Sequence, residues 1–336
     1  MMENLPRMFL ATLLLFAWMP LHTVQALEPE DGKLDFKPLA AETDHPKRYR
    51  LENYTFAWKL EPLRDLPASG VEIYSLTFPS PVTTATPENN TVWAEYYRPK
   101  GKGPFPGVLV LDILAGDQKL SRNVARHLAQ NGVAALFVQM AYYGPRRVAT
   151  GPRLLSLNIE HTMKAIGQTV LDCRCAAAWL AARPEIDPKQ LGILGTSLGS
   201  FMSALTAAME PRLNRVVLLL GGGGLVNAYW DHPKAKPYLP AMEFLGLNKE
   251  KLRKMIAPAD PLTYAELLGK KKLLMIAASR DDVVPPSAAK QLWEATGKQQ
   301  IIWLDSTHVG AAIYLFDVVG PIVRHFQGQE PALEKK

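Results

Sequence analysis

The stretch LGILGTSLGS, residues 191–200, decides the fold. Residues Gln190 to Leu194 have the pattern of a short apolar strand, and an alanine-rich helical pattern follows from Leu198 to Met209. Gly195-Thr196-Ser197-Leu198-Gly199 therefore lies where a strand turns into a helix. Glycine lacks a Cβ, so the chain can fold back sharply there and expose the hydroxyl of Ser197 at the start of the helix. The alternative interpretation is an ordinary glycine-rich loop.

Strand and helix patterns alternate on both sides of this motif. Continuous apolar strands are predicted at 107–111, 133–138, 190–194, 215–220, 272–277 and 300–304, and helices at 121–130, 159–182 and 198–209. Two strands with period-two alternation, 71–76 and 92–97, precede them. This order predicts one α/β domain, in which a mostly parallel sheet of about eight strands carries helices on both faces. We assign it to residues 71–327, with an N-terminal extension at 27–70 and a tail at 328–336.

Composition excludes several classes of protein. The 336 residues are 48% hydrophobic and contain two cysteines, which excludes a disordered chain and a disulfide scaffold. The net charge of +6 is spread along the chain without a basic run, so we expect no nucleic-acid partner. Cys173 and Cys175 point to opposite sides of a predicted helix, and no further Cys or His stands at ligand spacing. We therefore expect no metal site.

The N-terminus has the pattern of an export signal. Arg7 precedes the apolar run Met8 to Met19, and Val24-Gln25-Ala26 supplies small residues at a cleavage site after Ala26. The alternative is a retained membrane anchor, but a span requires about 20 apolar residues and this run is shorter. We expect residues 1–26 to be removed, leaving a periplasmic or secreted protein with no stable membrane span.

A serine hydroxyl is a poor nucleophile, and it needs a histidine base that a carboxylate orients. Two polar clusters follow predicted strands downstream of Ser197. Asp281 and Asp282 follow the strand at 272–277, and His308 follows the strand at 300–304. His308 is the expected base, because His325 lies late in the last helix and is expected on the surface. Either aspartate satisfies the requirement for the acid.

The run Asp281-Asp282-Val283-Val284-Pro285 resembles the Asp-x-x-Val-Pro motif of the α/β-hydrolase superfamily. The resemblance covers about residues 71–327 and is closest to the dienelactone-hydrolase-like and related esterase branches. It implies an α/β-hydrolase fold, with Asp281 as the acid and Asp282 as a solvated loop residue. True dienelactone hydrolases carry cysteine where this chain has Ser197, and this difference favours ester substrates over their lactone.

The same resemblance implies an oxyanion hole. Residues 112–116 resemble the Glu-Ile-Phe-Gly loop of dienelactone hydrolases, and aligning Gly116 with its glycine assigns one amide donor to Leu114. The second donor is the amide of Leu198, directly after the nucleophile. Backbone amides of this kind stabilise the negative charge that develops on the carbonyl oxygen.

Residues 142–147, Tyr-Tyr-Gly-Pro-Arg-Arg, follow another predicted strand and so lie at the sheet edge where ligands bind in open α/β sheets. We predict a substrate pocket there that includes Tyr143, Arg146 and Arg147, with one arginine binding an acidic group of the substrate. The alternative is an exposed loop whose arginine forms an ion pair with a neighbour.

Together these features predict an exported serine hydrolase that cleaves small-molecule carboxylic esters through an acyl-enzyme and needs no cofactor. One alternative is a serine peptidase of the prolyl-oligopeptidase type, although about 70 N-terminal residues are too few for a propeller. The other is a non-catalytic binding protein with this fold, which the complete set of three catalytic residues disfavours. The interval from Gly224 to Pro261 is a candidate for a partial lid over the site.

Overall fold

The structure is a computed structural model that describes residues 27–329, except 115–116, 231–232, 234–235 and 245. The predicted signal peptide, residues 1–26, lies outside the described residues, as do residues 330–336 of the predicted tail. Within the described part of the chain, no helix is both long and apolar enough to cross a membrane.

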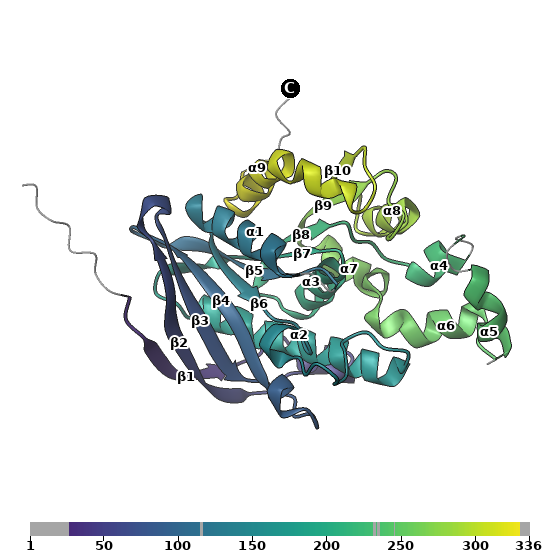
Figure 1. The fold of residues 1–336 in the computed structure, drawn as a ribbon, viewed down its shortest axis with the longest axis horizontal. Helices are drawn as coiled ribbons and strands as arrows, with labels where there is room; N and C mark the ends of the chain where they lie inside the picture. Colours follow the sequence, from purple (N-terminus) through teal and green to yellow (C-terminus); the bar gives the residue numbers. More distant parts are fainter. Residues whose placement is uncertain (1–26, 115–116, 231–232, 234–235, 245, 330–336) are drawn as a thin grey trace, which may run out of the picture.

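One ten-stranded sheet forms the centre of the molecule, with the strand order β1-β2-β3-β4-β6-β5-β7-β8-β9-β10. Six strands pair in parallel, in the order β6, β5, β7, β8, β9 and β10. Strands β1 to β4 pair antiparallel with one another, and β4 pairs antiparallel with β6. The strands are β1 Glu30–Phe36, β2 Tyr54–Leu66, β3 Val71–Pro79, β4 Thr91–Pro99, β5 Phe105–Leu111, β6 Ala134–Val138, β7 Ile186–Thr196, β8 Leu213–Leu219, β9 Lys272–Ala278 and β10 Gln300–Leu304. The predicted α/β-hydrolase fold is confirmed (Figure 1).

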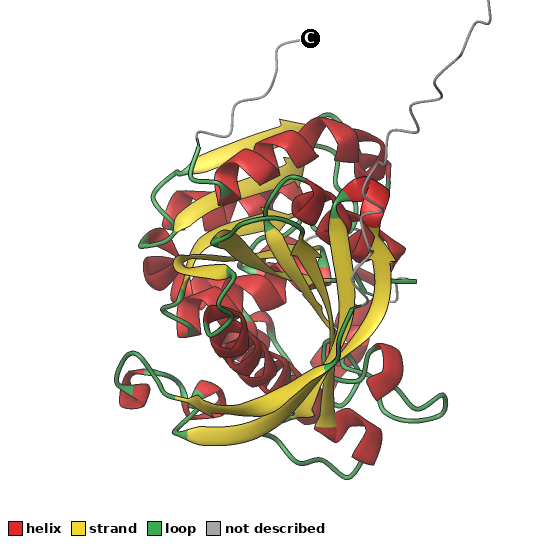
Figure 2. Cartoon of the chain, turned by 90° about the vertical axis from the view of Figure 1, so that its left-hand side faces the viewer, coloured by secondary structure: helices red, strands yellow, loops and turns green. Residues whose placement is uncertain are grey.

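Helices cover both faces of the sheet, which is strongly twisted (Figure 2). Residues of α2, α3, α7 and α8 share one core with one face, and α1 and α9 pack on the other. The helices are α1 Lys119–Gln130, α2 Ile159–Ala181, α3 Leu198–Met209, α4 Leu225–Trp230, α5 Leu239–Phe244, α6 Lys249–Ile256, α7 Ala265–Gly269, α8 Pro286–Ala295 and α9 Leu315–Phe326. Both faces of the parallel strands are therefore buried, which explains their continuous apolar sequences.

The sheet has ten strands rather than about eight, because β1 and β2 form within residues 27–70. The sequence of β1, EDGKLDF, is mostly polar, and among its residues only Phe36 is buried. In β2, Phe56 and Leu60 are buried and most other side chains are exposed or half-buried. β1 is the edge strand and β2 its neighbour, and few of their side chains reach the core, so their apolar pattern is weak.

A buried ion-pair cluster attaches this N-terminal segment to the helix layer. Arg174 of α2 is fully buried and donates to Glu42 at 2.8 Å, to the carbonyl of Tyr49 at 2.8 Å and to Glu210 at 3.3 Å. Burial alone would raise the pKa of Glu42, but the bonds from Arg174 and from the backbone N–H of Leu51 outweigh it, and this pKa is lowered. The carboxylate is therefore held in its charged form.

Replacing Arg174 with glutamine should lower the free energy of unfolding by about 3 kcal/mol, because it removes a charge that compensates the buried carboxylate of Glu210 and the half-buried carboxylate of Glu42. Urea denaturation measures the loss. Arg253→Gln is the control, since Arg253 pairs with Glu250 on the surface, and this change should cost less than about 1 kcal/mol. Equal effects of the two substitutions would contradict a structural role for the buried cluster.

Candidate active site

Ser197 stands between the end of β7 and the start of α3, in a strained conformation. Its backbone has φ 53° and ψ −115°, a region that residues with a Cβ rarely adopt. The N–H of Ser197 donates to the carbonyl of Leu219 at the end of β8, with a separation of 2.8 Å. The turn is therefore anchored to the neighbouring strand while its hydroxyl faces a pocket.

Two glycines make this turn possible. A Cβ on Gly195 would lie 2.0 Å from the carbonyl oxygen of Gly199. A Cβ on Gly199 would lie 2.5 Å from the carbonyl oxygen of Leu111 and 2.6 Å from that of Asp112. Backbone packs directly on backbone at both positions. An ordinary glycine-rich loop would not require such close contacts, so the alternative of a plain loop is disfavoured. The strand-to-helix turn is thus a tightly packed nucleophile elbow.

The structure brings Ser197, His308 and Asp281 together in one hydrogen-bonded chain. The Oγ of Ser197 lies 3.0 Å from Nε2 of His308, and Nδ1 of His308 lies 2.7 Å from Oδ2 of Asp281. A proton on Nδ1 is donated to the carboxylate, which leaves Nε2 as the acceptor for the serine hydroxyl. This is the catalytic arrangement of a serine hydrolase.

Asp281 rather than Asp282 bonds to the histidine. Asp281 is buried, and its second oxygen, Oδ1, accepts the backbone N–H groups of Val283 at 2.9 Å and Val284 at 2.7 Å. These bonds fix the carboxylate in the orientation that His308 needs. Asp282 is exposed at the surface.

The expected surface position of His325 is wrong. The side chain is buried in α9, where its ring packs edge-on against Phe326. Burial, together with the nearby charge of Arg215, lowers the pKa of His325 to about 4, so the ring is neutral at pH 7. The periodic pattern of α9 is apolar on the side that faces the sheet, and His325 lies on that side.

The loop after β5 lies against the elbow and carries Leu114. Asp112 anchors it, because its buried carboxylate accepts the hydroxyl of Ser121 at 2.7 Å and the backbone N–H of Ile113. Burial raises the pKa of Asp112. Leu114 lines the same pocket as Ser197, and Leu198 begins α3, where the first N–H groups have no partner within the helix. Ala115 and Gly116 lie outside the described residues. Gly116 is the glycine on which the resemblance to the dienelactone hydrolase loop rests.

An apolar pocket of about 400 Å³ opens beside Ser197 and His308. Its walls include Leu120, Leu219, Leu220, Ile276, Leu304 and Val318. At its rim, Leu114 is 51% exposed and Val309 is 79% exposed. Such walls offer dispersion contacts and few hydrogen bonds, so the pocket suits the hydrocarbon part of a ligand.

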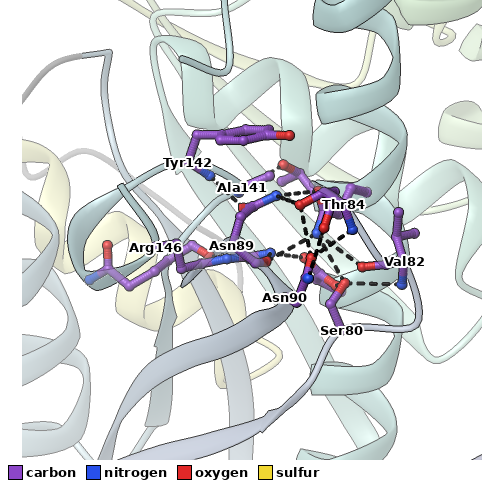
Figure 3. Close-up of polar contacts among 12 residues, drawn as sticks. Ser80, Val82, Thr84, Asn89, Asn90, Ala141, Tyr142 and Arg146 are labelled. Carbon is purple, nitrogen blue, oxygen red and sulfur yellow. Dashed lines mark hydrogen bonds and ion pairs between the residues drawn. The ribbon is translucent and has the colours of Figure 1, made fainter. Parts of the chain in front are cut away.

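Arg146, predicted to bind substrate, lines neither the apolar pocket nor the second pocket beside Tyr143. It is fully buried and donates to the carbonyl of Asn89 at 2.8 Å (Figure 3). It also donates to Asp172 at 2.8 Å and to the carbonyl of Gln139 at 3.0 Å. Tyr143 and Arg147 instead line a second pocket of about 280 Å³, together with Arg153. Sequence reasoning missed Arg153, although it lies in the same long loop after β6 that supplied the other candidates.

The candidate lid, residues 224–261, forms α4, α5 and α6 at the end of the molecule away from β1 to β3 (Figure 1). Among the described residues of this segment, none lines the apolar pocket. Tyr229 of α4 lies near the catalytic acid: burial and the charges of Asp281 and Asp282 raise its pKa to about 12. The described part of this segment therefore borders the acid rather than covering the pocket.

Two family models match the chain. One, described as Alpha/beta hydrolase domain containing 18, matches residues 64–231, and the other, described as Prolyl oligopeptidase family, matches residues 160–305. The chain is similar to Uncharacterized protein Rv2627c from Mycobacterium tuberculosis, with 26% identity over 144 residues, 43% of this chain. The alignment spans 33%, about a third, of that curated relative.

Solved structures with the same fold include two esterases. Acetyl xylan esterase from Paenibacillus sp. R4 has a TM-score of 0.64 and 17% identity, covering 81% of this chain and 88% of that one. Acetyl Xylan Esterase 1 from Thermoanaerobacterium sp. JW/SL YS485 has a TM-score of 0.55 and 21% identity, covering 75% and 82%. At 17% and 21% identity, the similarity shows that the fold is shared.

The geometry predicts unequal roles for the two neighbouring aspartates. Asp281→Asn should slow the labelling of Ser197 by a fluorophosphonate about 10³-fold or more, because the amide no longer holds His308 in the required tautomer. Asp282→Asn, the matched control, should label at nearly the parent rate. The rate is measured by mass spectrometry of the labelled protein over time. A larger loss in Asp282→Asn would move the acid role to the neighbouring residue.

Proposed function

The chain belongs to the family Alpha/beta hydrolase domain containing 18, and from its site we propose that it is a serine hydrolase that cleaves carboxylic esters through an acyl-enzyme. The observation that carries this proposal is the hydrogen-bonded chain from Ser197 through His308 to Asp281, which opens onto an apolar pocket. The two acetyl xylan esterases of the same fold are named as ester hydrolases, and this supports the choice of ester chemistry.

The proposed reaction has two halves. His308 takes the proton of Ser197 through Nε2 as Oγ attacks the ester carbonyl, and the amides of Leu114 and Leu198 stabilise the oxyanion. The tetrahedral intermediate expels the alcohol, to which His308 returns the proton, and the acyl group remains on Ser197. Water then attacks the acyl-enzyme with His308 as the base, and the carboxylic acid leaves. Asp281 holds the imidazole and stabilises its protonated form.

The apolar pocket supports a substrate with a hydrocarbon part of moderate size. Burial of each methylene there contributes about 0.8 kcal/mol to binding. A volume of about 400 Å³ lies within the range of small-molecule sites. We therefore propose esters of short to medium chain length as the substrates of this pocket.

A peptidase of the prolyl-oligopeptidase type is the second candidate, and the family match over residues 160–305 favours it. The matched region includes Ser197 and Asp281 and ends before His308. Parallel assays with acyl-proline 4-nitroanilides and 4-nitrophenyl esters separate the two functions. Faster cleavage of the anilides would favour the peptidase.

We also propose that the protein is exported, on the basis of the signal pattern in residues 7–26. N-terminal sequencing of the protein from the periplasm or the medium should begin at Leu27, because cleavage follows Ala26. A protein that retains residues 1–26 and fractionates with membranes would contradict export and favour the anchor.

Ser197→Ala and His308→Ala should each reduce kcat for 4-nitrophenyl butyrate by about 10⁴-fold or more, and the double variant should lose little further activity. The reason is that serine and histidine act as one unit in both halves of the reaction. Ser200→Ala is the matched control, since Ser200 is a buried serine in the first turn of α3, which directly follows Ser197, and this variant should remain active. Losses that add in the double variant would show that the two residues act independently.

A further inference from the structure

The second pocket, of about 280 Å³, adjoins the apolar pocket, and Leu114 lines both. Its other walls come from the turn at Tyr142–Gly144, from residues 153–155 and from Asp117 and Gln118 before α1. Leu114 is therefore the residue that a ligand would contact in both pockets. The two pockets together form a site with one apolar and one polar compartment.

The polar compartment carries unbalanced positive charge. Arg147 and Arg153 line it, and both are exposed. Asp117 also lines it, but its carboxylate lies 2.7 Å from the ammonium group of Lys119. Across the described residues, no carboxylate forms an ion pair with either arginine. Guanidinium groups bind carboxylates through paired hydrogen bonds, so a free anionic group suits this compartment.

A buried polar network fixes the turn that carries Arg147. Tyr142 has a positive φ of 62°, and its N–H donates to Oδ1 of Asn89 at 2.8 Å (Figure 3). Asn89 in turn donates to Gln168 of α2 at 2.7 Å. Directly before Arg147, the buried Arg146 ties the same turn to Asp172 of α2. Buried contacts thus hold the turn that leads into Arg147.

The segment with Arg153 is attached to the same helix. The carbonyl of Arg153 lies 2.8 Å from Nε2 of His161, and the ring of His161 packs on Tyr142 with centroids 5.0 Å apart. Leu154, the next residue, is buried. The two arginines therefore project from backbone segments that meet through Tyr142 and His161. Such fixed positions reduce the entropy that is lost when an anion binds.

We propose that Arg147 and Arg153 form an anion-binding subsite that selects ester substrates carrying a free carboxylate. The inference rests on the proposed ester hydrolysis and names its substrate class: an ester whose hydrocarbon part fills the apolar pocket while its charged group lies beyond Leu114. It replaces the predicted pair Arg146 and Arg147, because Arg146 serves to position the turn.

The test compares kcat/KM for two pairs of esters. In the first pair, mono-4-nitrophenyl adipate and its methyl ester, the charge lies on the acyl part. In the second pair, 4-acetoxybutanoate and its methyl ester, the charge lies on the alcohol part, and cleavage is assayed by acetate release. The parent should prefer the anionic member of at least one pair by about 10-fold or more. Arg147→Gln and Arg153→Gln should each reduce this preference, and the double variant should abolish it.

Rates on the neutral esters should fall much less than rates on the anionic esters in all these variants, because neither arginine contacts the reacting atoms. Arg48→Gln is the matched control: Arg48 is an exposed arginine that lines a neighbouring pocket, and its loss should not change the preference. The subsite is refuted by the absence of a charge preference in both pairs, by equal losses on charged and neutral esters, or by the same loss in Arg48→Gln.

Binding to the Ser197→Ala variant separates the subsite from the reaction. Calorimetric titration with monomethyl adipate should show binding about 10-fold tighter than that of dimethyl adipate, and adding Arg153→Gln should weaken this tighter binding by about 10-fold. If the parent cleaves none of the esters but this binding persists, ester hydrolysis fails and the anion subsite stands. If the parent cleaves neutral esters without charge preference and no such binding occurs, the subsite fails and ester hydrolysis stands.

Discussion

The close approach of backbone to backbone at Gly195 and Gly199 is the constraint on which the site depends. It forces Ser197 into its strained conformation and brings the first turn of α3 against the end of β5. The same contact therefore positions the nucleophile, the first amide of α3 and the loop that carries Leu114. A Cβ at either glycine would separate these elements, so the nucleophile, the first turn of α3 and the loop after β5 are positioned by backbone packing rather than by several side chains.

Those parts of the site that follow apolar strands could be predicted from the sequence. His308 is 111 residues from Ser197 and 27 from Asp281, but each follows a parallel strand, and parallel strands end at one edge of the sheet. The two N-terminal strands could not be predicted in the same way. In the strand EDGKLDF only Phe36 is fully buried and Leu34 packs partly against the core, because an edge strand needs few apolar side chains to be held by its neighbour.

Arg146 and Arg147 show a different limit of sequence reasoning. The two neighbours are chemically identical, yet one is fully buried and the other is exposed. Their difference arises from the turn, where Tyr142 and Gly144 both have positive φ, and from Asp172, which lies on a helix 26 residues away. No local sequence pattern around Arg146 predicts that Asp172 is its partner. A buried guanidinium is costly unless it is paired. The fold therefore places Arg146 where the carboxylate of Asp172 and two backbone carbonyl groups accept its hydrogen bonds.

The central claim is that the elbow serine forms a covalent acyl-enzyme, and trapping that intermediate tests it most directly. The protein is mixed with 4-nitrophenyl butyrate, quenched in acid within the first turnover and digested for mass spectrometry. The account predicts a butyryl group on the peptide that contains Ser197, and its absence from the Ser197→Ala variant. Steady release of 4-nitrophenol from an enzyme that never carries an acyl group, or an acyl group on another residue, would contradict it.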